Sequence, residues 1–234
     1  MDFAIIAAGE GSRLKEEGID FPKGLVKING RPMIERLVEI AARHGADSLS
    51  CIVNDHSHDL LGWFVNNNHP IKINLTVKST ASSMHSLFEL RRFLEGRDFC
   101  LTTVDTIFKE DEFNDFINYC KNNNGKAVIA VTDYIDDEKP LYTRIDNDMN
   151  ILSFDDEING HTYVTGGIYY LPGTIFGLLE KLINSGEMHL RNFQRSLISA
   201  GYEVKAWPFT KIVDVDHISD IKAAEEFVSA YTKY

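Results

Sequence analysis

The stretch F-A-I-I-A-A-G-E-G-S-R-L-K-E-E-G-I-D-F-P-K, residues 3–23, carries the most specific pattern in this 234-residue sequence. Its first six residues form a continuous apolar run, which is typical of a strand buried on both faces of a sheet. Gly9 and Gly11 then allow a sharp turn, so that backbone N–H groups can face an anion. Because Arg13 and Lys23 flank the turn, the stretch predicts a strand followed by a loop that binds phosphates.

Two common phosphate-binding motifs do not fit this loop. A Walker A loop would close on Gly-Lys-Ser/Thr, which is missing here. A dinucleotide-binding fingerprint would have a third glycine at the position of Leu14, and we expect no helix before Gly24. The composite pattern GxGxR-x8-PK, directly after the first strand, is therefore the informative one.

The charge of the chain limits its partners. There are 24 Lys and Arg residues against 35 Asp and Glu, a formal net charge of −11. Nucleic-acid phosphates repel such a surface, so we expect no nucleic-acid partner. No stretch approaches the ~18 apolar residues of a transmembrane helix, and the first residues lack the basic region of a signal peptide. We expect a cytoplasmic protein without a membrane partner.

Apolar runs alternate with helical patterns along the first half of the chain. The expected strands cover residues 3–8, 49–53, 71–77, 99–104 and 127–132, and the expected helices 33–44, 59–67, 83–94 and 112–121. This alternation predicts a single-domain, Rossmann-like α/β fold. Its sheet is expected to be mixed but mainly parallel, with helices on both faces.

The pattern changes after residue 132. Short strands at 142–145 and 151–154 are joined by Asn147-Asp148-Met149-Asn150, a hairpin signal. We expect a small β-hairpin lid at about 135–165, built into a single domain that spans residues 1–234. The remaining expected elements are a strand at 163–171, two helices, a short strand that ends at Trp207 and a last helix at 220–231.

The first loop resembles the signature A-A-G-x-G-S/T-R-x8-P-K of the nucleotidyltransferase family of NDP-sugar pyrophosphorylases and related cytidylyltransferases. Residues 29–34, Asn-Gly-Arg-Pro-Met-Ile, resemble the segment that follows it in that family. The resemblance implies an NTP-binding half at about 1–132 and an acceptor-binding half at about 133–234. It implies that Arg13 and Lys23 are catalytic at the NTP phosphates. It also assigns nucleotide binding to Ala7, Ala8, Gly9, Glu10, Gly11 and Ser12.

Residues 79–87, Ser-Thr-Ala-Ser-Ser-Met-His-Ser-Leu, occupy the place of the family's base- and ribose-binding segment. The resemblance therefore adds Thr80, Ser82 and Ser83 to the nucleotide-binding residues. The sugar enzymes usually carry Gly-Thr-Ala-Gly-Ala there, whereas this segment lacks glycine and looks like the phosphocholine cytidylyltransferase branch. It weakly favours CTP as the NTP. Helix N-capping by Ser82 and Ser83 is an alternative interpretation that is compatible with ligand binding.

An apolar strand at 101–104 ends in Asp105. Ligands of open α/β sheets lie beyond the carboxyl ends of the strands, and Mg²⁺ prefers oxygen ligands beside phosphates. The family places a metal-binding Asp at this strand end, so the resemblance implies that Asp105 holds Mg²⁺. A turn or N-cap role is the alternative.

Asp214 and Asp216 precede the last helix and resemble the family's second acidic site. Alignment with the sugar enzymes favours Asp214 as the metal ligand, and alignment with other cytidylyltransferases favours Asp216. The choice stays open here. We expect the two side chains to point to opposite faces, so that one binds the metal and the other makes structural hydrogen bonds. Asp220 is expected to start the helix.

Residues 165–169, Thr-Gly-Gly-Ile-Tyr, resemble the family's acceptor strand. The resemblance assigns acceptor binding to Gly166, Gly167 and Tyr169, and a β-bulge is the alternative for the glycines. Aromatic residues with neighbouring carboxylates suit a cationic head group. That set slightly favours an amino-alcohol phosphate such as phosphocholine over a sugar 1-phosphate, and consists of Tyr163, Tyr169, Tyr170, Trp207, Asp155, Asp156 and Glu157.

The predicted function is Mg²⁺-dependent transfer of a nucleoside monophosphate from an NTP to a sugar 1-phosphate or an amino-alcohol phosphate, with release of pyrophosphate. A phosphate monoester is largely a dianion at pH 7, so no general base is required. Two alternatives are a catalytically inactive nucleotide-binding regulatory module on the same fold and a Rossmann oxidoreductase. The sequence leaves the oligomeric state open.

Overall fold

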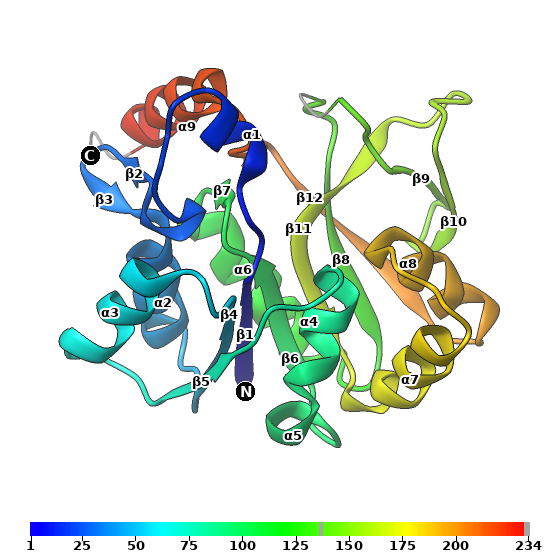
Figure 1. Ribbon diagram of the computed structural model, residues 1–234. Coiled ribbons are helices and arrows are strands. Elements are labelled where there is room, and N and C mark those ends of the chain that lie inside the picture. The colour runs from blue at the N-terminus through cyan, green and yellow to red at the C-terminus, as the bar shows by residue number, and fades with distance from the viewer. Residues whose placement is uncertain (136–137, 232–234) are drawn as a thin grey trace.

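A nine-stranded mixed sheet runs through the middle of the molecule (Figure 1). The computed structural model describes residues 1–135 and 138–231. Four neighbouring strands are parallel, in the order β6-β1-β4-β5. Their bounds are β1 (Asp2–Ala7), β4 (Leu49–Val53), β5 (Ile73–Val77) and β6 (Phe99–Thr103). Because these strands are parallel, their carboxyl ends lie at one edge, where the phosphate loop and Asp105 also emerge.

β11 (Tyr163–Leu171) joins the two halves of the sheet. It pairs antiparallel with β6 on one side and with β8 (Ala127–Thr132) on the other. β12 (Val204–Phe209) pairs parallel with β8 and runs two residues beyond the predicted end at Trp207. β9 (Tyr142–Ile145) and β10 (Ile151–Asp155) form the predicted hairpin and extend the sheet beside β11. Residues 136 and 137 of the expected lid segment lie outside the described residues.

Helices cover both faces of the sheet, as predicted (Figure 1). One face carries α2 (Met33–Arg43), α3 (His58–Asn66) and α6 (Glu110–Lys121), and the other carries α4 (Ser83–Glu89), α5 (Arg91–Leu94), α7 (Phe176–Asn184) and α8 (Leu190–Ser199). The helix expected at 83–94 is divided at Leu90. None of the helices in the described part of the chain has the length and apolarity needed to span a membrane.

A third apolar cluster lies above the carboxyl edge of the sheet. It contains residues of α1 (Ser12–Glu16), β2 (Lys27–Ile28), β7 (Thr106–Phe108), β13 (Ile212–Asp214) and α9 (Ile218–Tyr231). β7 pairs with β13, β2 pairs with β3 (Arg31–Pro32), and the short helix η1 (Lys23–Leu25) precedes β2. The expectation of no helix before Gly24 is wrong. α1 starts directly after the loop because Gly11 adopts a left-handed conformation (φ 61°) and Leu14 is buried in this cluster.

Gly173 opens the short helix η2 (Gly173–Ile175) after β11. A Cβ atom at this position would overlap backbone atoms of Gly96 and Arg97, which cannot move aside as a flexible side chain would. We expect Gly173→Ala to lower the free energy of unfolding by ~1–3 kcal/mol, measured by urea denaturation.

The control for this prediction is Gly177→Ala, at the exposed second residue of α7, where a Cβ meets no atom within 4 Å. This substitution should be neutral or stabilise by up to about 1 kcal/mol, because alanine has a higher helix propensity than glycine. Equal losses in both variants would contradict the overlap argument.

Candidate active site

Lys23 joins two carboxylates from distant parts of the chain. Its ammonium group donates to Asp105 Oδ2 and, at 2.6 Å, to Asp216 Oδ1. Lys23 stands at the start of η1, Asp105 in the turn between β6 and β7, and Asp216 between β13 and α9. Burial alone lowers the pKa of Lys23, but the charges of Asp105 and Asp216 outweigh it, so the pKa is raised and the side chain stays charged.

Asp105 has one carboxylate oxygen to spare. Its Oδ1 is buried and has no hydrogen-bond partner among residues 1–135 and 138–231. A buried charged oxygen without a partner is costly, so this atom fits a site that receives a cation. The described residues contain no group of three or more His, Cys, Asp or Glu side chains suited to a metal. Any Mg²⁺ here would therefore rely on two carboxylates together with phosphate and water oxygens, its usual ligand set beside NTPs.

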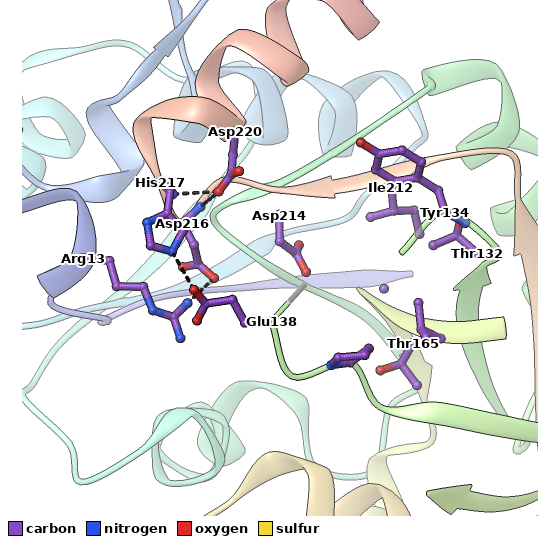
Figure 2. Close-up of a pocket in the computed structure, with 13 residues that line it drawn as sticks. Arg13, Thr132, Tyr134, Glu138, Thr165, Ile212, Asp214, Asp216, His217 and Asp220 are labelled. Carbon is purple, nitrogen blue, oxygen red and sulfur yellow. Dashed lines mark hydrogen bonds and ion pairs between the residues drawn. The ribbon is translucent and has the colours of Figure 1, made fainter. Parts of the chain in front are cut away.

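Asp214 and Asp216 line the same pocket (Figure 2). The expectation that they point to opposite faces is wrong, because residues two apart on an extended chain share a face. Asp216 lies beside Asp105 through Lys23, whereas Asp214 accepts a hydrogen bond from Thr106 Oγ1 at 3.3 Å. The two carboxylates thus have different neighbours in the structure, a difference that the sequence does not predict.

Arg13 reaches the same cluster from α1. Its Nη1 donates to Asp216 Oδ2 at 2.8 Å, and its side chain is 42% exposed. Gly9, Glu10 and Ser12 of the preceding loop are exposed as well. The guanidinium and this loop therefore lie beside Lys23 and open to solvent, where an anionic ligand can reach them.

Glu17 follows α1 and ties the end of that helix to the start of α9. Its two carboxylate oxygens accept hydrogen bonds from the Ile218 N–H at 2.7 Å and from the His217 ring at 2.6 Å. These contacts lower the pKa of Glu17 and raise that of His217. Glu138, between β8 and β9, lies 3.7 Å from His217 Nε2. The sequence analysis missed Glu17, His217 and Glu138, since no local pattern relates His217 to residues that lie so far from it in the sequence, 200 positions away in the case of Glu17.

The segment expected to bind the base surrounds the start of α4. Ser82 is the N-cap of α4, because its side chain accepts the His85 N–H at 3.4 Å. Its hydroxyl also lies 2.9 Å from His85 Nδ1. Thr80 Oγ1 is 2.6 Å from Ser86 Oγ, and Ser83 is exposed. The capping interpretation of Ser82 is confirmed, while nucleotide binding by Thr80, Ser82 and Ser83 stays a prediction.

The glycines of the acceptor strand lie against protein atoms. A Cβ on Gly166 would overlap Ile212, and a Cβ on Gly167 would overlap the hydroxyls of Thr103 and Thr106. The register between β11 and β8 also shifts between Thr165 and Tyr169, in keeping with the bulge alternative. Close packing therefore accounts for both glycines, and their contact with an acceptor stays a prediction.

The expected aromatic wall does not form. Tyr170 is buried on the α6 face and bonds to Asp98 and Asn124, and Trp207 packs on Tyr119 of that face. Tyr169 is buried on the opposite face, where Gln194 Nε2 donates to its hydroxyl at 3.1 Å. Successive strand residues alternate between faces, so Tyr170 and Trp207 cannot share a wall with Tyr169, whereas Tyr163 packs on the face of Tyr169. Asp156 is paired with Arg191 and Arg195.

Comparison with known proteins agrees with this architecture. The model of the family described as MobA-like NTP transferase domain matches residues 3–199. The bifunctional protein GlmU of Methanococcus maripaludis is 27% identical over 208 residues, which cover 86% of this chain and 48% of that protein. The D-glycero-α-D-manno-heptose 1-phosphate guanylyltransferase of Campylobacter jejuni is 25% identical over 199 residues, covering 83% and 87%. This chain spans about half the length of the GlmU proteins that it matches.

Solved structures share the fold. The inositol-1-phosphate CTP transferase from T. maritima superposes with a TM-score of 0.84 at 17% identity, over 99% of this chain and 96% of that one. The CTP:phosphocholine cytidylyltransferase LicC of Streptococcus pneumoniae gives a TM-score of 0.75 at 19% identity, over 97% and 98%. The predicted fold class is therefore confirmed.

We expect Glu17→Ala to release the start of α9 from the end of α1. The Ile218 amide, which donates to Glu17, should exchange with solvent several-fold faster in hydrogen-exchange mass spectrometry or NMR. The His217 amide is an internal control, because it donates to Asp220 instead. Glu16→Ala, at the exposed neighbouring position, should leave both amides unchanged. An unchanged exchange rate of the Ile218 amide in Glu17→Ala would contradict the anchoring role of Glu17.

Proposed function

The chain belongs to the family of MobA-like NTP transferase domains, and from this premise we propose that it transfers a nucleoside monophosphate from an NTP to a phosphorylated polyol, such as a sugar 1-phosphate. The reaction requires Mg²⁺ and releases pyrophosphate. The observation that carries the proposal is the convergence of Lys23, Asp105 and Asp216, with Arg13 beside them, at the carboxyl edge of the sheet. None of the relatives named above is described as an inactive module, and this chain retains the charged residues that transfer requires.

Asp105 and Asp216 are the residues that we propose hold Mg²⁺. The orphaned Asp105 Oδ1 and the position of Asp216 across the same ammonium group support this pair. When bound, Mg²⁺ neutralises and orients phosphate oxygens of the NTP. In the described structure the Lys23 ammonium provides the positive charge between the two carboxylates.

The protein's part in the reaction is positioning and charge neutralisation. An oxygen of the acceptor phosphate attacks the α-phosphorus, and the bond from that phosphorus to the bridging oxygen of the β-phosphate breaks. Pyrophosphate leaves with the electron pair. Because the acceptor is already a dianion at pH 7, no side chain has to remove a proton. Lys23 and Arg13 offset the negative charge on the transferring phosphate.

The nucleotide is expected on the loop of Ala7 to Ser12 and on Thr80, Ser82 and Ser83, which lie on the half of about 1–132. The acceptor then lies against the half of about 133–234. The glycine-free segment 79–87 supports CTP, weakly, over UTP, GTP or dTTP.

The lining of the pocket supports a polyhydroxylated acceptor over a cationic one. Thr132, Thr165, Glu138 and Asp214 offer the hydroxyl and carboxylate groups that bind sugar hydroxyls. Tyr134 contributes a phenol ring to the lining, and Lys211 Nζ stands 3.9 Å from the centre of that ring. An ammonium ligand on that ring would meet a like charge, so the sequence-based preference for a cationic acceptor is revised here.

Two comparisons bear on the acceptor. The heptose 1-phosphate guanylyltransferase and the inositol-1-phosphate CTP transferase are named for polyol phosphates. The phosphocholine cytidylyltransferase shares the fold, and segment 79–87 resembles its branch. An amino-alcohol phosphate is therefore the second candidate and the contrast arm of the assay.

Lys23→Ala and Arg13→Ala should each lower kcat by ~10²–10³ while the protein stays folded, because charge stabilisation at the transferring phosphate is lost. Steady-state assays of pyrophosphate release measure this, and circular dichroism checks the fold. Lys15→Ala, an exposed cation on the same short helix, is the matched control and should keep its activity. Full activity of either active-site variant at saturating substrates would exclude that residue from the mechanism.

The proposed reaction is tested with CTP, UTP, GTP and dTTP, each combined with glucose 1-phosphate, mannose 1-phosphate, myo-inositol 1-phosphate, phosphocholine and phosphoethanolamine. We expect a nucleotidyl product by mass spectrometry with at least one of the polyol phosphates. Excess chelator should abolish it, and added Mg²⁺ should restore it. Product with the two amino-alcohol phosphates only would reverse the choice of acceptor. Undiminished turnover in chelator would contradict the metal site.

A further inference from the structure

We propose that Asp214 recognises the acceptor rather than the metal: its carboxylate accepts a hydrogen bond from an acceptor hydroxyl, and the buried Thr106, which lies against the half-buried Thr103, holds it in orientation. This assignment rests on the proposed function and names the residue that reads the polyol part of the acceptor. The structural basis is the pairing of β13 with β7, which places Asp214 beside Thr106.

The short ribbon of β7 and β13 decides where Asp214 points. Asp214 pairs with Thr106 and Ile212 with Phe108. Side chains alternate along a strand, so Ile212 and Asp214 face one way and Val213 the other. Val213 is buried in the cluster with α1 and α9, whereas Ile212 and Asp214 line the pocket. Figure 2 shows the Asp214 carboxylate in the middle of that pocket, facing the side of Glu138 and Thr165.

Two threonine hydroxyls support this carboxylate from below. Thr106 Oγ1 donates to Asp214 Oδ1 at 3.3 Å and lies 2.7 Å from Thr103 Oγ1. A hydroxyl has a single hydrogen, so when Thr106 donates to Asp214 only its lone pairs remain for the Thr103 hydroxyl. Thr106 is completely buried, which makes this arrangement rigid and protects it from competing water.

Gly167 makes room for this chain of hydroxyls. A Cβ on Gly167 would overlap both Thr103 Oγ1 and Thr106 Oγ1. Gly166 does the same for Ile212, the neighbour of Asp214 on the pocket side of β13. The glycine pair that the sequence analysis assigned to the acceptor thus supports acceptor binding indirectly, by letting the β7–β13 ribbon lie against β11.

The two carboxylates of this segment have different partners. Asp216 is held by the cations Lys23 and Arg13, at the phosphate end of the pocket. Asp214 accepts a hydrogen bond from the Thr106 hydroxyl and lines the pocket beside Thr165 and Gly166 of β11. Burial raises the pKa of Tyr169 on that strand, and the negative charge of Asp214 raises it further, in keeping with their proximity.

The test compares Asp214→Asn with Asp216→Asn in the full chain. In Asp214→Asn, the amide oxygen should accept the hydrogen bond from Thr106, so that the NH₂ group points into the pocket. A hydrogen-bond donor then replaces the carboxylate oxygen that accepted from the substrate's hydroxyl. We expect the KM for the best polyol phosphate of the panel to rise ~10- to 100-fold, the loss typical of a hydrogen bond to a charged group. The KM for the NTP and the affinity for Mn²⁺ in the presence of CTP, titrated calorimetrically, should change less than ~2-fold. Asp216→Asn should instead weaken Mn²⁺ binding.

Thr106→Val tests the supporting chain without removing the carboxylate. It keeps the volume of the side chain and removes the donor to Asp214, so the acceptor KM should rise while Mn²⁺ affinity stays unchanged. The matched control is Thr102→Val, at a buried threonine of β6 that takes no part in the contacts among Thr103, Thr106 and Asp214. It should leave the acceptor KM and the Mn²⁺ affinity unchanged. Deoxy analogues of the accepted polyol phosphate identify the hydroxyl, because the Asp214→Asn defect should vanish for the analogue that lacks it.

Different experimental results would contradict the proposed function and the assignment of Asp214. A wild-type chain that binds CTP and Mn²⁺ but converts none of the acceptors would overturn the proposed function. An active wild type in which Asp214→Asn weakens Mn²⁺ binding and leaves the acceptor KM unchanged would overturn the assignment of Asp214. That result would instead identify Asp214 as a metal ligand.

Discussion

The ion pairs of Lys23 with Asp105 and Asp216 are the constraint on which the rest of this structure depends. The Lys23 side chain is 10% exposed, and that of Asp105 is 20% exposed. Desolvating these groups is costly, and only the simultaneous presence of opposite charges offsets the cost. The three residues come from η1, the β6–β7 turn and the segment before α9. The phosphate loop, the sheet edge and the C-terminal segment must therefore meet at one point.

The sheet and the third cluster bring these segments together. Parallel β1 and β6 end side by side, which places the loop of Arg13 next to Asp105. The β7–β13 ribbon returns the chain to this edge about 100 residues later, and Glu17 secures α1 to the first turn of α9. In a chain of net charge −11, two cations are thus concentrated among carboxylates at the place where phosphates are expected. These two cations are already paired with Asp105 and Asp216, so the proposed Mg²⁺ would add the positive charge that phosphates require there.

Most of the sheet was predictable because its strands are short, continuous apolar runs that end at polar loops. The start of α1 was not, because burial of Leu14 in a cluster formed with the C-terminal segment overrides the local polarity. The aromatic wall failed for a similar reason. Tyr169 and Tyr170 are adjacent in sequence, yet lie on opposite faces of the sheet. Spacing predicts alternation, but which face borders the pocket depends on the neighbouring strands.

The sequence by itself determined the class of fold, the glycine-rich turn after β1 and the set of charged residues from which a site can be built, because these follow from local periodicity and from short motifs. Only the tertiary structure decided how Asp214 and Asp216 differ. Two positions apart, they are equivalent in any local pattern. Pairing of β13 with β7 places Asp214 beside Thr106. The positions of η1 and α1 place Lys23 and Arg13 beside Asp216. These partners lie 108 to 203 residues away, beyond the reach of any local pattern.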